Sequence, residues 1–160
     1  METLTLTQKN ARVRRGRQSE TVPEAVMKTI LYVEDDEHDV FFLNRAFANH
    51  APALRVQNVH SIEEAMNYLR GTGIYADRAQ FPAPDLLVSD VSIPGGSGYQ
   101  LLAWVRKNGE ISGLPFILLT GSAQDTQLEK AMTNGADVCL EKCTDFKELL
   151  AAVERLLERD

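Results

Sequence analysis

Five short apolar runs, rich in branched and aromatic side chains, alternate along the chain with longer stretches that carry apolar residues at helical spacing. The short runs predict strands at 29–34, 54–59, 85–90, 115–120 and 138–141. The longer stretches predict helices at 37–49, 61–70, 99–107, 123–134 and 146–158, the second of them opened by a capping box of Ser61 and Glu64. Regular alternation of this kind predicts a parallel sheet, because each helix returns the chain to the edge where the next strand begins.

The predicted fold class is α/β, with a doubly wound five-stranded parallel sheet between two helical layers (three-layer α/β/α). Right-handed crossovers favour the flavodoxin-like strand order 2-1-3-4-5. Residues 71–84 lie between the second helix and the third strand and predict an irregular loop. Sheets of this class bind ligands at the carboxyl ends of their strands, where the strand order reverses. We therefore expect the functional site between the ends of the first and third strands.

Charge divides the chain into two parts. The 160 residues carry a net charge of −6, yet residues 1–28 hold six Lys/Arg against three Asp/Glu, which leaves −9 on the remainder. Residues 1–27 have no sustained hydrophobic period and predict a flexible basic N-terminal arm, with Met27 as a hypothetical natural start; residues 28–160 predict one folded domain. The acidic body argues against nucleic acid as a partner.

The hydropathy and cysteine content predict a cytoplasmic protein. No apolar stretch approaches the ~20 residues that cross a membrane, and no secretory signal pattern opens the chain, so no membrane partner is expected. Cys139 and Cys143 are the only cysteines and lack the accompanying ligands of a zinc site. We interpret them as small buried residues, with a redox role as the alternative.

Polar side chains stand at the carboxyl ends of four of the five predicted strands. The first strand ends at Glu34 and is followed by Asp35 and Asp36, the third ends at Asp90, the fourth ends at Thr120, and Lys142 follows the fifth. A carboxylate, a hydroxyl and an amine beside an acidic cluster suit the transfer of a phosphoryl group to an aspartate. A divalent cation would offset the repulsion between the carboxylate and the phosphoryl group, and Mg²⁺ prefers such oxygen ligands. The alternative for the acidic triplet is that it only caps a helix.

These motifs resemble the receiver domain of bacterial two-component response regulators. The resemblance rests on the Glu34-Asp35-Asp36 triplet, on Asp90 with the Val-Ser-Ile-Pro-Gly-Gly-Ser-Gly that follows it, on Leu-Leu-Thr-Gly-Ser around Thr120, and on Leu-Glu before Lys142. It covers about residues 28–158. The stretch 34–43 and the long loop 71–84 are most similar to stand-alone regulators associated with phytochrome-type kinases.

The resemblance implies a role for each of these positions. Asp90 would accept the phosphoryl group, Thr120 would be the switch hydroxyl and Lys142 would pair with the phosphate. The implied Mg²⁺ ligands are Asp35, Glu34 through water, Asp90 and the backbone carbonyl of Ser92, and no other cofactor is implied. Asp36 aligns just beyond the acidic pair, and we expect it to start the helix.

The resemblance also implies the partners. A sensor histidine kinase or a phosphotransfer protein would donate the phosphoryl group to Asp90. The predicted fold ends at residue 158, so we expect no output domain on this chain and an output through contact with a downstream protein. A homodimer is compatible with the resemblance. We expect no enzymatic activity beyond the protein's own phosphorylation and dephosphorylation.

Two positions depart from the pattern of the family. Cys139 stands where receivers usually have an aromatic residue, and Cys143 stands where they usually have a proline after the lysine. We expect a trans bond between Lys142 and Cys143, because a cis bond before a residue other than proline costs about 2.5–4 kcal/mol. The resemblance therefore leaves open how the signal reaches the surface. The alternative function is a receiver-like adaptor that acts without phosphorylation, whereas an aspartyl phosphatase is disfavoured because Ser92 stands where its general acid would be.

Overall fold

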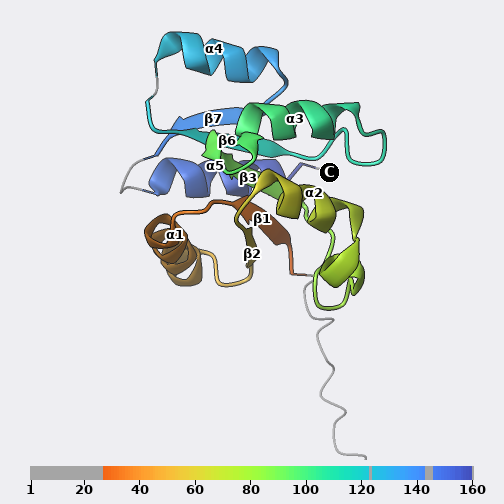
Figure 1. Ribbon diagram of the computed structural model, residues 1–160. Coiled ribbons are helices and arrows are strands. Elements are labelled where there is room, and N and C mark those ends of the chain that lie inside the picture. Colours follow the sequence, from red (N-terminus) through yellow and green to blue (C-terminus); the bar gives the residue numbers. More distant parts are fainter. Residues whose placement is uncertain (1–26, 123, 143–145, 160) are drawn as a thin grey trace, which may run out of the picture.

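The computed structural model describes residues 27–122, 124–142 and 146–159, so the predicted arm lies outside the described residues except for Met27. Its main sheet has five parallel strands in the order β2-β1-β3-β6-β7 (Figure 1). The strands are β1 (Thr29–Val33), β2 (Arg55–Val59), β3 (Leu86–Asp90), β6 (Phe116–Thr120) and β7 (Val138–Glu141). In chain order this is 2-1-3-4-5, which confirms the predicted fold class and topology.

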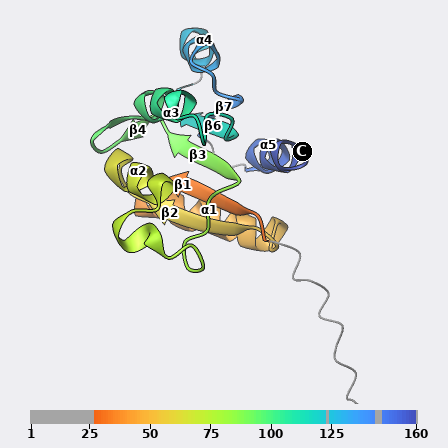
Figure 2. The same cartoon turned by 90° about the vertical axis from the view of Figure 1, so that its right-hand side faces the viewer.

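Five helices cover the two faces of the sheet. They are α1 (Glu37–His50), α2 (Ile62–Arg70), α3 (Gly98–Lys107), α4 (Asp125–Thr133) and α5 (Lys147–Leu157). Helices α1 and α5 lie on one face and α2 and α3 on the other, with α4 beyond α3 toward the β7 edge (Figure 2). The predicted fourth helix begins later than expected, at Asp125, and Ala123 lies outside the described residues.

The side chains of β1 alternate between two hydrophobic clusters. Ile30 and Tyr32 pack with residues of α1 and α5, whereas Leu31 and Val33 pack with residues of α2 and α3. Every residue of β1, β3 and β6 is buried, as a parallel sheet covered on both faces requires. None of the helices in the described part of the chain is long and apolar enough to span a lipid bilayer.

The prediction of an irregular loop at 71–84 is wrong at its start, where η1 (Gly73–Ala76) forms a short 3-10 helix. Aromatic packing fixes the loop: the rings of Tyr75 and Phe81 lie 5.0 and 6.0 Å from the ring of Tyr68 in α2. The Arg78 guanidinium donates hydrogen bonds to the backbone oxygens of Tyr68 and Leu69 at the end of α2. Contacts with the preceding helix α2 thus order a segment whose local sequence carries no helical pattern.

The helix starts follow the predicted capping chemistry only in part. Ser61 accepts a hydrogen bond from the Glu64 backbone N–H at 3.1 Å, but the Glu64 carboxylate accepts one from the His60 N–H instead of closing the predicted capping box. A complete capping box forms at α3 between Ser97 and Gln100. It follows a two-stranded ribbon of β4 (Ser92–Ile93) and β5 (Gly96–Ser97).

Gly98, the first residue of α3, packs closely against the end of β3, and this leads to a prediction about stability. A Cβ atom at Gly98 would lie 2.5 Å from the backbone oxygen of Asp90 and 2.8 Å from Cδ2 of Leu118. We expect Gly98→Ala to lower the free energy of unfolding by about 1–3 kcal/mol, because the crowded backbone must shift. Urea denaturation measures this change. Gly109→Ala is the control, since nothing lies within 4 Å of its Cβ position; equal losses in the two variants would contradict the proposed crowding.

Candidate functional site

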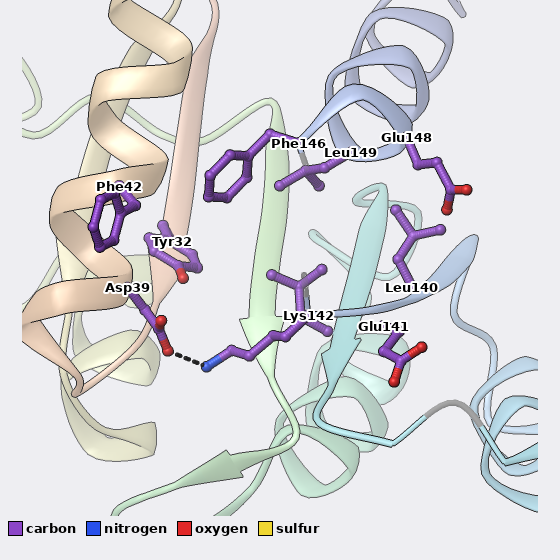
Figure 3. A pocket seen from close by; sticks show the side chains of 10 residues that line it. Tyr32, Asp39, Phe42, Leu140, Glu141, Lys142, Phe146, Glu148 and Leu149 are labelled. Atoms are coloured by element: carbon purple, nitrogen blue, oxygen red, sulfur yellow. Dashed lines mark hydrogen bonds and ion pairs between the residues drawn. The ribbon is translucent and has the colours of Figure 1, made fainter. Parts of the chain in front are cut away.

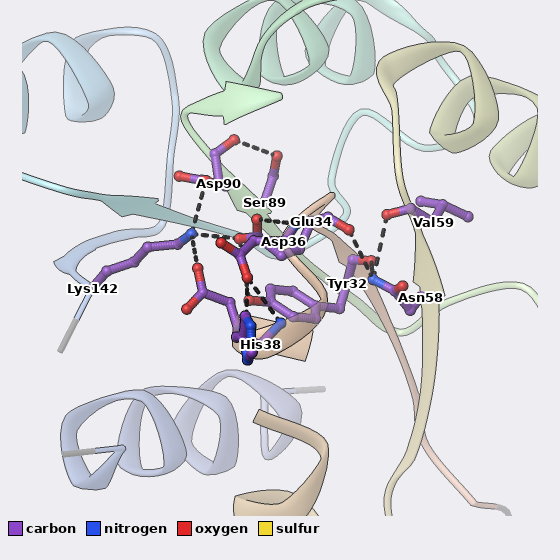
Figure 4. Close-up of polar contacts among 10 residues, drawn as sticks. Tyr32, Glu34, Asp36, His38, Asn58, Val59, Ser89, Asp90 and Lys142 are labelled. Atoms are coloured by element: carbon purple, nitrogen blue, oxygen red, sulfur yellow. Dashed lines mark hydrogen bonds and ion pairs between the residues drawn. The ribbon is translucent and has the colours of Figure 1, made fainter. Parts of the chain in front are cut away.

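The ammonium group of Lys142 lies among three carboxylates at the carboxyl edge of the sheet (Figure 4). Its Nζ is 2.5 Å from Oε2 of Glu34 and 2.8 Å from Oδ2 of both Asp39 and Asp90. An ammonium has three protons, so these three acceptors use its full donor capacity. The fold thus brings together side chains from the ends of β1, β3 and β7 and from the first turn of α1.

Backbone contacts hold the end of β1 in place. The Glu34 N–H donates to the Val59 carbonyl at 2.9 Å, and the Asn58 side-chain amide donates to the Tyr32 carbonyl at 2.9 Å. The Glu34 carboxylate is 1% exposed and accepts hydrogen bonds from the Asp36 N–H at 3.0 Å and the Tyr32 hydroxyl at 3.4 Å. These contacts fix a carboxylate that cannot turn out into water.

Burial and hydrogen bonding oppose each other in this cluster. Burial raises the pKa of Glu34 even though Lys142 donates a hydrogen bond to it. Burial alone would lower the pKa of Lys142, but its hydrogen bonds to Asp39, Asp90 and Glu34 outweigh that effect and raise the pKa above its ordinary value. Lys142 therefore stays protonated at neutral pH and supplies the positive charge of the site.

Asp39 is the member of this cluster that the sequence analysis missed. It stands three residues after Asp36, one turn into α1, and its side chain is 43% exposed. The spacing was the available signal, because residues one turn apart lie on the same side of a helix. Asp39 lies one turn before the buried Leu43 of α1, and only the folded chain shows that its carboxylate reaches Lys142.

The rest of the acidic triplet divides into two roles. Asp36 caps α1, since its Oδ1 accepts hydrogen bonds from the backbone N–H groups of His38 at 2.8 Å and Asp39 at 3.2 Å. This confirms the expectation that Asp36 starts the helix, and the hydrogen bonds from Asp39 and His38 lower its pKa. Asp35 lies between the buried Glu34 and this cap and is exposed.

Thr120 lies at the end of β6 but turns its hydroxyl toward the start of α4. The hydroxyl is 3.0 Å from Oε1 of Gln127 and 3.1 Å from the Ser122 carbonyl, and it accepts a hydrogen bond from the Ser122 N–H at 3.3 Å. Within the described residues, no hydrogen bond joins it to Asp90 or Lys142. The backbone N–H of Lys142 donates to the Thr120 carbonyl at 2.7 Å, so the fold brings Thr120 to the expected edge while its hydroxyl bonds elsewhere.

The carboxylates are paired with Lys142 and do not form a preorganised metal-binding site. Among the described residues, no group of three or more His, Cys, Asp or Glu side chains is arranged to hold a metal ion. The donor chemistry still fits a hard cation: the available groups are oxygens, and three carboxylates around one ammonium leave an excess of negative charge. Mg²⁺ needs only one or two carboxylates because water completes its shell. Ser92, whose carbonyl is an expected ligand, begins β4 two residues after Asp90 and is exposed.

An apolar pocket of about 380 Å³ opens beside Lys142, between α1 and α5 (Figure 3). Its apolar lining includes Phe42, Leu140, Phe146 and Leu149. On α1, Phe41 and Phe42 are 59% and 52% exposed. A hydrophobic surface therefore adjoins the charged cluster.

Cys139 has the character of a packing residue. Its thiol is free and half-buried, it packs against the cluster under α2 and α3, and burial raises its pKa. A raised pKa keeps the sulfur in the less reactive thiol form. Cys143 and its bond to Lys142 lie outside the described residues.

The shared ammonium leads to a prediction about stability. We expect Lys142→Met to lower the free energy of unfolding at pH 7 by about 1–3 kcal/mol, because the buried Glu34 carboxylate loses its compensating charge. The double variant Glu34→Gln with Lys142→Met should recover at least half of that loss, because the amide carries no charge. Urea denaturation of wild type, both variants and Glu34→Gln gives the four free energies of unfolding that a double-mutant cycle needs. Strictly additive losses would show that the two groups do not depend on each other.

Comparison with known proteins assigns most of the described part of the chain to one family. A family model described as the response regulator receiver domain matches residues 30–154. Response regulator Rre1 of Synechocystis is 30% identical over 129 residues, which are 81% of this chain and 52% of Rre1. The probable methanogenesis regulatory protein FilR2 of Methanothrix harundinacea is 26% identical over 129 residues, 81% of each chain. The structure of the phosphorylated cyanobacterial phytochrome response regulator RcpA has a TM-score of 0.69 and 27% identity over 82% of this chain and 91% of RcpA.

Proposed function

The chain belongs to the response regulator receiver domain family, and from this premise we propose that it is a response regulator that accepts a phosphoryl group on Asp90. One observation carries the proposal: the Asp90 carboxylate, 8% exposed at the end of β3, lies 2.8 Å from the Lys142 ammonium. A carboxylate nucleophile needs a nearby positive charge to receive a phosphoryl group. The phosphorylated state of RcpA, a similar structure, supports the same chemistry.

The proposed reaction forms and breaks one bond at phosphorus. A carboxylate oxygen of Asp90 attacks the phosphorus of a phosphohistidine, the new O–P bond forms, and the P–N bond breaks with its electron pair left on the imidazole nitrogen. Lys142 offsets negative charge on the phosphoryl oxygens, and Thr120 donates a hydrogen bond to one of them after its hydroxyl turns. Water later attacks the phosphorus, releases inorganic phosphate and restores Asp90. The protein is therefore its own substrate and not an enzyme for another one.

We propose Mg²⁺ as the cation of this site. Asp35, Asp90 and the Ser92 carbonyl would hold it directly and Glu34 through water. When bound, it supplies positive charge between the Asp90 carboxylate and the incoming phosphoryl group. The all-oxygen donors and the excess of negative charge around Lys142 support this assignment.

We further propose that a phytochrome-type histidine kinase, or a phosphotransfer protein, docks on the pocket between α1 and α5. The exposed rings of Phe41 and Phe42 stand on the helix that also carries Asp39 to Lys142, so a protein seated there lies next to Asp90. The resemblance to a phytochrome response regulator supports this class of kinase. The proposal places the protein in the cytoplasm, with output through a downstream protein or a homodimer and without nucleic acid or membrane contact.

Phosphorylation of Asp90 is tested with a small phosphodonor. We expect wild-type protein incubated with acetyl phosphate and MgCl₂ to gain one phosphoryl group by intact mass spectrometry, and Asp90→Asn to gain none because it lacks the nucleophile. Chelation of Mg²⁺ should slow the gain in the wild type. If wild type and Asp90→Asn both stay unmodified, the adaptor alternative holds; an equal gain in both would place the acceptor elsewhere.

The docking surface is tested by comparing the rate of phosphorylation by a protein donor with the rate by a small-molecule donor. We expect Phe42→Ser to slow phosphotransfer from a phosphorylated phytochrome-type kinase about five- to thirty-fold, as loss of a central apolar contact does. Phosphorylation by acetyl phosphate should not change, since Phe42 does not touch Asp90. The matched control is Ile74→Ser, which removes a side chain that is 74% exposed on η1. Equal slowing by the two variants, or slowing with acetyl phosphate as well, would rule out this surface.

A further inference from the structure

We propose that Gln127 is a positioning residue that couples the Thr120 hydroxyl to helix α4, so that phosphorylation releases the first turn of that helix. The inference rests on the proposed function, because it needs a phosphoryl group on Asp90. It supplies a route from the site to the surface in a chain where Cys139 replaces the usual aromatic residue.

The hydrogen bond between Thr120 and Gln127 lies in a sheltered place. Thr120 is 3% exposed, and its hydroxyl has Oε1 of Gln127 at 3.0 Å and the Ser122 carbonyl at 3.1 Å as its acceptors. A hydroxyl has one proton, so it donates to one acceptor at a time. Of the two acceptors, only the Gln127 side chain belongs to α4, so a hydroxyl that donates to Gln127 joins the end of β6 to that helix.

Gln127 also connects to α3. The Tyr99 hydroxyl lies 3.5 Å from the Gln127 backbone oxygen, and the Tyr99 ring lies 4.5 Å below the Lys130 ammonium. Tyr99 and Cys139 pack against the same hydrophobic cluster. An aromatic ring from α3 thus lies within electrostatic reach of position 139, and it contacts Gln127 and Lys130 of α4.

Helix α4 has few buried side chains, so a single hydrogen bond contributes a large share of what holds it to the rest of the fold. Of its side chains in the described part of the chain, only Ala131 is buried, and Met132 is 52% exposed. Figures 1 and 2 show α4 at the outer edge of the fold, beyond α3. Elements with few buried contacts open at low free-energy cost, so a small change in bonding shifts their conformation.

Phosphorylation would change the partner of Thr120. A phosphoryl oxygen on Asp90 is an anionic acceptor, and hydrogen bonds to ionised groups are stronger than hydrogen bonds to a neutral amide. The single hydroxyl proton then leaves Gln127, and the first turn of α4 loses its tie to the sheet. Because coupling between sites is reciprocal, a variant that already lacks the tie should bind the phosphoryl group more tightly.

The test uses beryllofluoride, which stands in for the phosphoryl group, with MgCl₂ and the full chain. We expect Gln127→Ala to bind beryllofluoride about two- to ten-fold more tightly than wild type, the range that loss of one neutral hydrogen bond allows. Amide hydrogen exchange in α4 should be fast in the free variant and change little on binding. In wild type, exchange in α4 should become faster when beryllofluoride binds.

Two further variants complete the design. Gln127→Glu keeps an acceptor at the same position but makes it anionic, so it should hold the Thr120 hydroxyl more tightly than wild type, weaken beryllofluoride binding and reduce the exchange response of α4. Gln124→Ala is the matched control: it removes the same side chain at the cap of α4, where Gln124 makes no side-chain capping hydrogen bond, and should behave as wild type.

The outcomes separate this inference from the proposed function. If wild type takes up neither acetyl phosphate nor beryllofluoride, the proposed function fails and this inference fails with it. If wild type takes up both, but Gln127→Ala matches it in affinity and in the exchange response of α4, the coupling is refuted and the proposed function stands. An equal change in Gln124→Ala would also refute it, because the effect would then belong to the helix start and not to Thr120.

Discussion

One ammonium group shared by three carboxylates is the interaction on which the site depends. Lys142 joins the end of β7 to the ends of β1 and β3 and to the first turn of α1, so the charge balance of the site requires four elements in their native places. Without that ammonium, the buried Glu34 carboxylate would lose its compensating positive charge. The same balance leaves negative charge in excess, and this makes the site receptive to a cation and, through Lys142, to an anionic group.

The sheet divides the surroundings of this cluster into two sides with different tasks. On the side of α1 and α5, exposed phenylalanines and an apolar pocket adjoin Lys142 and offer a surface to another protein. On the other side, the Thr120 hydroxyl points away from Asp90 toward a lightly packed helix. In the proposed function, arrival of a phosphoryl group and the response to it would therefore take place on opposite faces of the sheet, with Asp90 between them.

Much of this arrangement was predictable because strands and helices carry distinct periodicities. The strand order, the helix cap at Asp36 and the placement of Glu34, Asp90 and Lys142 at one edge follow from the alternation of elements and the rules of parallel sheets. The errors occur where individual side-chain contacts, and not the periodic pattern, decide the local structure. The loop at 71–84 gains η1 because Tyr75 and Phe81 pack on Tyr68, and Glu64 bonds to His60 instead of closing a capping box.

The fold class and the polar side chains at the strand ends could be predicted from the sequence, because short-range patterning sets the elements and the chirality of the connections sets their order. The partners of those side chains follow from the three-dimensional packing. Asp39 reaches Lys142 across 103 residues of chain, and the Thr120 hydroxyl bonds to Gln127 rather than to the carboxylates. Such choices depend on burial and on distances of a few ångströms between elements, which no local pattern encodes.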